Sequence, residues 1–145
     1  MKIVSIFAGH DSNITFYDTE KQKVNVIEIE RLVRKRYFRL HVDNSDQKIK
    51  EILLKCKEIA NKFWNFSSPD QVVITADGAL SQISMLSEIF ETSNIIRVKN
   101  HHECHASCTH FLSPNKESLV FSFDGGGNDG FFNIYHIKDN TMTLL

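Results

Sequence analysis

One order of elements occurs twice along the chain, and this recurrence constrains the fold more than any other feature of the sequence. Each copy consists of an apolar strand, a polar or glycine-rich loop, a second strand, a turn and a third strand. The copies occupy residues 2–8, 9–12, 13–18, 19–22 and 23–29, and then 118–123, 124–130, 131–137, 138–140 and 141–145. An internal duplication of this kind indicates two related lobes that face each other across a cleft.

Helical patterns and short apolar runs fill the interval between the two copies. Asn44 or Ser45 is the candidate N-cap of a helix whose apolar stripe we expect to face the core. The stripe consists of Ile49, Ile52, Leu53, Cys56, Ile59, Ala60 and Phe63. Residues 72–74 and 95–98 are predicted strands, residues 80–90 are a predicted helix, and a further helix is expected to begin near Asn100. Strands separated by helices predict an α/β fold in which helices flank a mixed five-stranded sheet.

We therefore expect a first lobe over residues 1–113 and the start of a second, incomplete lobe over residues 114–145. The second copy stops when its third strand has barely begun, and its sheet would keep unpaired edges. We expect the fold to be completed by a further C-terminal part or by a partner chain. An exposed sheet edge also favours self-association, for example as a homodimer.

Composition restricts the classes of function. The 145 residues include 17 Lys and Arg against 18 Asp and Glu, so the net charge of −1 predicts no binding to nucleic acid or to an anionic membrane surface. No apolar run approaches the roughly 20 residues that span a bilayer, and the segment Met1–Phe7 does not resemble a signal peptide. Three cysteines, an odd number, suit a reducing compartment. The sequence predicts a soluble, cytoplasmic protein.

The two loops between the first and second strands of each copy are candidate phosphate sites. Asp124–Gly130 contains four glycines, whose backbone N–H groups can approach an anion closely. The alternative is an ordinary hairpin turn. We favour a nucleotide site because seven residues are many for a hairpin and because Gly9–Ser12 forms a polar loop at the equivalent place. The candidate nucleotide contacts are Ser12, Gly125, Gly126 and Gly127.

The segment Asn100–His105 carries the strongest chemical signal. If Asn100 caps a helix, His101 and His105 lie one turn apart on one face and can chelate one metal ion. His102 with His105 is an alternative pair. Because cysteines also lie near this stripe, a structural zinc site that includes Cys104 or Cys108 is a further alternative. The alternative without a metal is that these histidines lie at the surface, or are hydrogen-bonded in the core, and have no role in function.

A carboxylate would complete a two-histidine, one-carboxylate site, which typically suits Fe²⁺ and leaves positions open for substrate. Asp124, at the tip of a strand that follows the histidine helix, is the first candidate. Asp129 is the second candidate, although an aspartate in a loop more often serves the turn itself.

Four segments together resemble the O-carbamoyltransferases of the nodulation-protein (NodU/CmcH) type. In that family the motifs GHDS, EER(F/L)SR, HHxxHA and DGxG occur in this order. The corresponding segments here are Gly9–Ser12, Glu30–Arg34, His101–Ala106 and Phe123–Gly127. The resemblance extends over essentially the whole chain, with departures at Ile29 and Val33. It implies the actin-like ATPase fold, which is built from two duplicated RNase H-like lobes.

The resemblance implies a reaction in two stages. Carbamoyl phosphate and ATP first form a carbamoyl adenylate in a separate C-terminal domain. The actin-like domain then binds this adenylate through a divalent metal ion and passes the carbamoyl group to a hydroxyl of a sugar or natural product. His101, His105 and Asp124 correspond to metal ligands. Fe²⁺ is the expected ion, with Zn²⁺ and Mn²⁺ as alternatives.

The resemblance also assigns roles to residues near the N-terminus. His10 and Asp11 correspond to positions at the reacting end of the cleft, where a general base or an acceptor-positioning group is needed. Arg31 and Arg34 correspond to a basic segment that meets phosphate or carbamoyl oxygens. This chain alone is expected to be inactive, because it lacks the part that makes the adenylate and closes the cleft.

Three alternatives remain open at the level of sequence. One is a threonylcarbamoyl-adenosine synthase component, which also has an HxxxH metal pair. Another is a hydrogenase-maturation carbamoyltransferase, whose acceptor is a protein cysteine. The third belongs to a different class: a non-catalytic nucleotide- or metal-binding remnant, or one half of a split protein.

Overall fold

A computed structural model describes residues 1–42, 44–75, 83–98 and 100–145. The chain divides into two compact units, Met1–Arg97 and Val98–Leu145, and each is described by itself. Among the helices in the described ranges, none is both long enough and apolar enough to cross a membrane.

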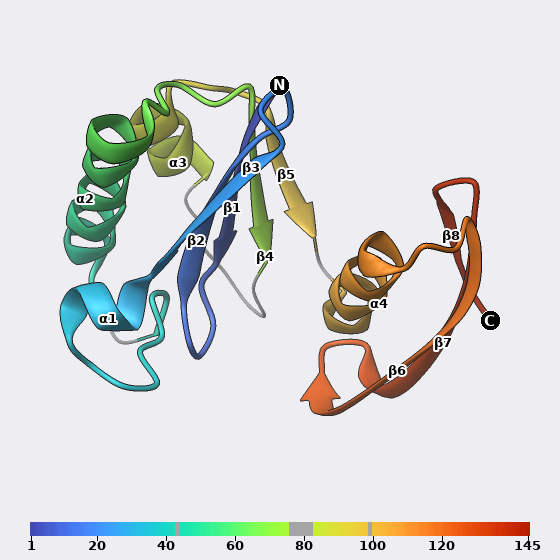
Figure 1. Cartoon of the computed structure of the whole chain (residues 1–145). Coiled ribbons are helices and arrows are strands. Elements are labelled where there is room, and N and C mark those ends of the chain that lie inside the picture. The colour runs from blue at the N-terminus through green and yellow to red at the C-terminus, as the bar shows by residue number, and fades with distance from the viewer. Residues whose placement is uncertain (43, 76–82, 99) are drawn as a thin grey trace. The chain divides into compact units, whose positions relative to one another are not determined.

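The first unit is a five-stranded mixed sheet with helices against it (Figure 1). In chain order its elements are β1 (Lys2–Phe7), β2 (Asn13–Asp18), β3 (Lys23–Glu28), α1 (Ile29–Val33), α2 (Asp46–Trp64), β4 (Gln71–Thr75), α3 (Ile83–Phe90) and, at its end, β5 (Ile95–Val98). The strand order is β3-β2-β1-β4-β5. Strand β2 is antiparallel to β1 and β3, whereas β4 is parallel to β1. The predicted five-stranded mixed sheet with flanking helices is confirmed.

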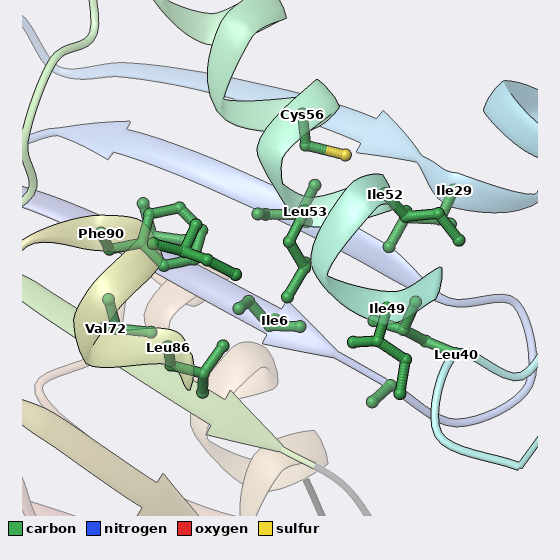
Figure 2. Packing of buried hydrophobic residues seen from close by; sticks show 14 of the residues in the cluster. Ile6, Ile29, Leu40, Ile49, Ile52, Leu53, Cys56, Val72, Leu86 and Phe90 are labelled. Atoms are coloured by element: carbon green, nitrogen blue, oxygen red, sulfur yellow. The ribbon is translucent and has the colours of Figure 1, made fainter. Parts of the chain in front are cut away.

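Helix α2 supplies the largest part of the core. Its N-cap is Ser45, whose hydroxyl accepts a hydrogen bond from the backbone N–H of Lys48 at 3.4 Å. Figure 2 shows its buried side chains directed at the sheet and at α3. The buried residues of α2 are Ile49, Ile52, Leu53, Cys56 and Ala60.

Phe63 was expected in the same stripe, and this prediction is wrong, because its exposed fraction is 67%. After Ala60, the next residue of α2 that packs against the core is Trp64, four positions later, and not Phe63, three positions later. The Trp64 ring lies 5.7 Å from the ring of Phe16, between centroids, and packs against the core. Of the predicted helix over residues 80–90, α3 accounts for Ile83–Phe90, and residues 80–82 lie outside the described residues.

The second unit is a curved antiparallel sheet with one helix packed on its concave side (Figure 1). Its elements are α4 (His101–Leu112), β6 (Glu117–Gly127), β7 (Gly130–Lys138) and β8 (Thr141–Leu144). The core comprises Ala106, Val120, Tyr135 and Ile137, with Met142 partly buried beside them. Because α4 packs on β6 and β7, the compact units divide after Arg97. The lobe boundary expected after residue 113 stays a prediction.

The glycine-rich segment Asp124–Gly130 differs from the expected open loop. Strand β6 continues to Gly127, β7 resumes at Gly130, and only Asn128 and Asp129 lie between them. The strand register shifts between Phe123 and Gly127, which accommodates the extra residues as an irregularity of the ladder. The expected seven-residue loop is therefore wrong in extent, because β6 and β7 form a hairpin whose bulge shortens the turn to two residues. The predicted binding of a nucleotide phosphate by this segment stays a prediction.

The neighbouring leucines of α2 test which face is the core. Leu53 has an exposed fraction of 0% and Leu54 of 44%. We expect Leu53→Ala to lower the free energy of unfolding by about 2–5 kcal/mol through lost burial and a cavity. Leu54→Ala should cost at most about 0.5 kcal/mol. Urea unfolding followed by the fluorescence of Trp64, the single tryptophan, measures both, and equal losses would contradict the assignment of the core face.

Candidate metal centre

His101 and His105 lie one turn apart at the start of α4. Residues four apart share one face of a helix, so both imidazoles point to the same side. Their ring centroids are 4.6 Å apart, and their Nε2 atoms are 3.0 Å apart. The His101 side chain is 20% exposed and that of His105 is 54% exposed, so the pair lies at the surface of the second unit.

Asp124, on β6, completes a group of three. Its Oδ2 atom lies 2.7 Å from Nε2 of His101 and 3.3 Å from Nε2 of His105. Among the residues that the structure describes, only these three form a cluster of His, Cys, Asp or Glu ligand atoms close enough to hold one ion. The structure thus brings together the three residues that the sequence suggested as metal ligands, all within one compact unit.

The separations between the three ligand atoms fit a first-row divalent ion. Imidazole nitrogens and carboxylate oxygens bind such ions at about 2.0–2.2 Å, so neighbouring ligand atoms are about 3.0–3.5 Å apart. The observed separations of 2.7, 3.0 and 3.3 Å lie in or just below this range. The Asp124 side chain is 45% exposed, which leaves space for further ligands on the solvent side. Two imidazoles and one carboxylate suit Fe²⁺, Zn²⁺ or Mn²⁺.

The carboxylate of Asp124 is held in its charged form. The hydrogen bond from His101 lowers the pKa of Asp124 from its ordinary 3.8 to about 2, with further lowering by the backbone N–H of Gly125 at 2.6 Å. A ligand that is already ionised at neutral pH releases no proton when a metal ion binds.

The hairpin tip caps the helix that carries the histidines. Asn128 Oδ1 accepts a hydrogen bond from the backbone N–H of His101 at 3.0 Å. The Asp129 carboxylate accepts from the backbone N–H of His102 at 3.0 and 3.2 Å. The first N–H groups of a helix have no partner within the helix, and a negative charge there is favourable. Asp129, the second candidate for the metal carboxylate, is therefore placed as a helix cap.

His102 does not face the triad. Its ring is fully buried, with Nδ1 2.6 Å from the hydroxyl of Ser122 and Nε2 3.0 Å from the carbonyl oxygen of Gly130. The alternative metal pair of His102 with His105 is therefore not formed. The structure also leaves both nearby cysteines outside the cluster: Cys104 Sγ lies 3.3 Å from the carbonyl oxygen of Asn100, and Cys108 is exposed.

Gly127 lies directly against His101, the first candidate metal ligand. A Cβ atom at this position would come within 2.7 Å of Cβ of His101 and 2.9 Å of its ring. The ladder also pairs Gly127 with Gly130, and the N–H of Gly125 is bonded to Asp124. Part of this glycine run therefore serves the packing of the helix on the hairpin. Contact of Gly125, Gly126 and Gly127 with a nucleotide stays a prediction.

The candidate residues of the first unit lie in the loop after β1. His10 Nδ1 is 2.9 Å from Asp11 Oδ2, and the two side chains are 66% and 56% exposed. Ser12 is fully buried, and its hydroxyl lies 2.9 Å from the carbonyl oxygen of Phe38 and accepts the N–H of Leu40 at 2.9 Å. Ser12 thus has a structural role in this unit, and its contact with a nucleotide stays a prediction.

The two candidate arginines lie around α1. Arg31 forms an ion pair with Glu28, and its side chain is 80% exposed. Arg34 is exposed and ends α1 in the left-handed backbone conformation, with φ of 58°. Their predicted contact with phosphate or carbamoyl oxygens stays a prediction.

Comparisons with known proteins support the fold. The sequence matches no protein-family model and no curated protein. Among solved structures, the chain is similar to the crystal structure of the Aquifex aeolicus member of the Ppx/GppA protein family, with a TM-score of 0.50 and 14% identity. All of this chain is covered but only 50% of that protein, so the chain spans about half its length. The likeness supports an actin-like ATPase, RNase H-like fold and, at this identity, nothing finer.

The contact between Gly127 and His101 can be tested without metal. Gly127→Ala forces the two elements apart, and we expect an overpacking cost of about 1–3 kcal/mol together with shifted ring resonances of His101. Gly125→Ala is the matched control, because a Cβ there meets no atom within 4 Å. Thermal unfolding and NMR spectra of the histidine rings measure the two effects. Identical behaviour of the two variants would contradict the close approach.

Proposed function

We propose that the chain is the N-terminal portion of a metal-assisted carbamoyltransferase. One observation carries the proposal: the HHxxHA segment and the following DG segment, which resemble those of O-carbamoyltransferases, place His101, His105 and Asp124 around one point. In this proposal the donor is a carbamoyl adenylate made from carbamoyl phosphate and ATP, and the acceptor is a hydroxyl of a sugar or natural product.

The proposed transfer breaks one bond to the carbamoyl carbon and forms another. The acceptor oxygen bonds to this carbon, the bond from the carbon to the adenylate phosphate oxygen breaks, and AMP leaves with that electron pair. The acceptor proton passes to a general base. A divalent ion bound at the triad supplies Lewis-acid polarisation of phosphate and carbonyl oxygens.

His10 is the proposed base, with Asp11 as its partner. A carboxylate beside Nδ1 favours a proton on that nitrogen, which leaves the lone pair on Nε2. Because both side chains are largely exposed, a solute can reach them. Arg31 and Arg34 are proposed to bind oxyanions through their guanidinium groups.

A second candidate function is a metal-binding module without catalysis. It is favoured by the position of all three candidate ligands inside one compact unit, Val98–Leu145. Binding of the adenylate distinguishes this module from the transferase. The related threonylcarbamoyl-type transferase differs from the first proposal in the group that it transfers, and the hydrogenase-maturation-type transferase differs in its acceptor, a protein cysteine.

The metal itself is tested first. We expect anaerobically purified protein to hold close to one divalent ion per chain, with iron as the expected element. His101→Ala/His105→Ala should lose it. His110→Ala/His136→Ala removes the same number of histidines from the second unit without touching the triad, and should keep it. Elemental analysis of the three proteins decides, and equal metal content in all three would place the ion elsewhere.

The adenylate is tested next, on protein loaded with Co²⁺. A non-hydrolysable carbamoyl adenylate analogue should shift the visible absorption of the ion, because its oxygens enter the open positions. Carbamoyl phosphate and AMP serve as separate controls for the two ends of the ligand. If the absorption spectrum of the Co²⁺-loaded protein does not change when the analogue is added, the result would favour the non-catalytic module over the transferase.

A further inference from the structure

Helix α4 and strand β6 contact each other through a ladder of side-chain pairs. Ser118, Val120, Ser122 and Asp124 alternate along β6 and therefore share the face that α4 covers. Ser118 contacts His110, Ser122 contacts His102, and Asp124 contacts the pair His101 and His105. Between them, Val120 shares the small apolar core with Ala106 of α4. The metal triad is thus the last rung of the ladder, and the contact between His102 and Ser122 is the rung beside it.

The His102 rung has a fixed orientation. The carbonyl oxygen of Gly130 can only accept a hydrogen bond, so Nε2 of His102 carries the proton and donates it at 3.0 Å. In the imidazole tautomer with its proton on Nε2, Nδ1 is the acceptor, and the hydroxyl of Ser122 lies 2.6 Å from it. A buried ring with both nitrogens bonded cannot rotate without leaving polar groups unsatisfied, so it fixes α4 against both strands of the hairpin.

The cap acts on the same end of the helix. Asp129 binds the backbone N–H of His102, while the ring of His102 binds Ser122. These contacts fix the distance between His102 and Ser122. His102 is the neighbour of His101 in the helix, and Ser122 lies two residues before Asp124 in the strand. Metal ligands need to be held to within about 0.5 Å of the productive geometry, and rigid supporting contacts do this.

We propose that His102, Ser122 and Asp129 are positioning residues of the metal centre, which set the distance between the imidazoles of α4 and the carboxylate of Asp124. The inference rests on the proposed metal centre. None of the three residues offers a ligand atom to the triad. Loss of such a supporting contact typically weakens metal binding by about 10- to 100-fold.

Two serines of β6 give a matched test. Ser122→Ala removes the hydroxyl beside His102. Ser118→Ala removes the hydroxyl that lies 2.7 Å from Nδ1 of His110, in the same pair of helix and strand. Co²⁺ is titrated into the full chain, and its affinity and visible absorption bands are recorded. Thermal unfolding in the presence of a chelator gives the stability of each metal-free protein. Asp129→Ala tests the cap in the same way, with Asp129→Asn, which keeps an oxygen acceptor, as its rescue.

We expect Ser122→Ala and Asp129→Ala to weaken Co²⁺ binding by about 10- to 100-fold and to move the absorption bands. Asp129→Asn should recover most of the loss, and Ser118→Ala should leave affinity and spectrum unchanged. Equal weakening by Ser118→Ala and Ser122→Ala would show a general loss of stability and overturn the proposal. So would wild-type affinity in both Ser122→Ala and Asp129→Ala. A wild-type chain that binds no divalent ion would refute the metal centre itself, and the positioning role with it.

Discussion

The second unit depends on a buried polar contact, that of His102 with the β6–β7 hairpin. Its apolar core is small, since few side chains besides Ala106, Val120, Tyr135 and Ile137 are buried there. A small apolar core supplies little stabilisation, and because apolar contacts have no preferred direction, it does little to fix how the helix is oriented on the sheet. Buried polar groups are costly unless bonded, so the pairing of His102 with Ser122 and Gly130 admits one alignment of helix and hairpin. The cap from Asp129 favours the same alignment.

This alignment divides the candidate metal centre into a preset part and a dependent part. Two imidazoles one turn apart are placed by the helix alone, whatever α4 packs against. The carboxylate of Asp124 reaches them only when α4 lies on β6 in the observed register. Ion binding and docking of the helix are therefore linked: an ion that needs all three ligands stabilises the docked state, and a loosely docked helix lowers the affinity for the ion.

The sequence predicted local features well and contacts between distant residues less well. Alternation placed β2 at Asn13–Asp18 without error, and the spacing of His101 and His105 predicted that their rings lie side by side on one helix face. The prediction for Phe63 was wrong because an apolar stripe advances by three or four residues, and the sequence does not show which of the two spacings ends the stripe. The predicted length of the loop at Asp124–Gly130 was wrong because glycine content does not reveal a β-bulge. The links of His102 to Ser122 and of Asp129 to α4 join residues 20 and 27 positions apart, which no local pattern encodes.

The two copies of the strand–loop–strand plan use their polar loop residues differently. In the first copy, the buried hydroxyl of Ser12 holds the loop to Phe38 and Leu40, and the side chains of His10 and Asp11 stay exposed. In the second copy, the turn is reduced to two residues whose side chains cap α4. The carboxylate available to a ligand there is that of Asp124, further down the strand. The same topology thus leaves the candidate base His10 and its partner Asp11 exposed at one loop, and places the candidate ion ligand Asp124 beside the other.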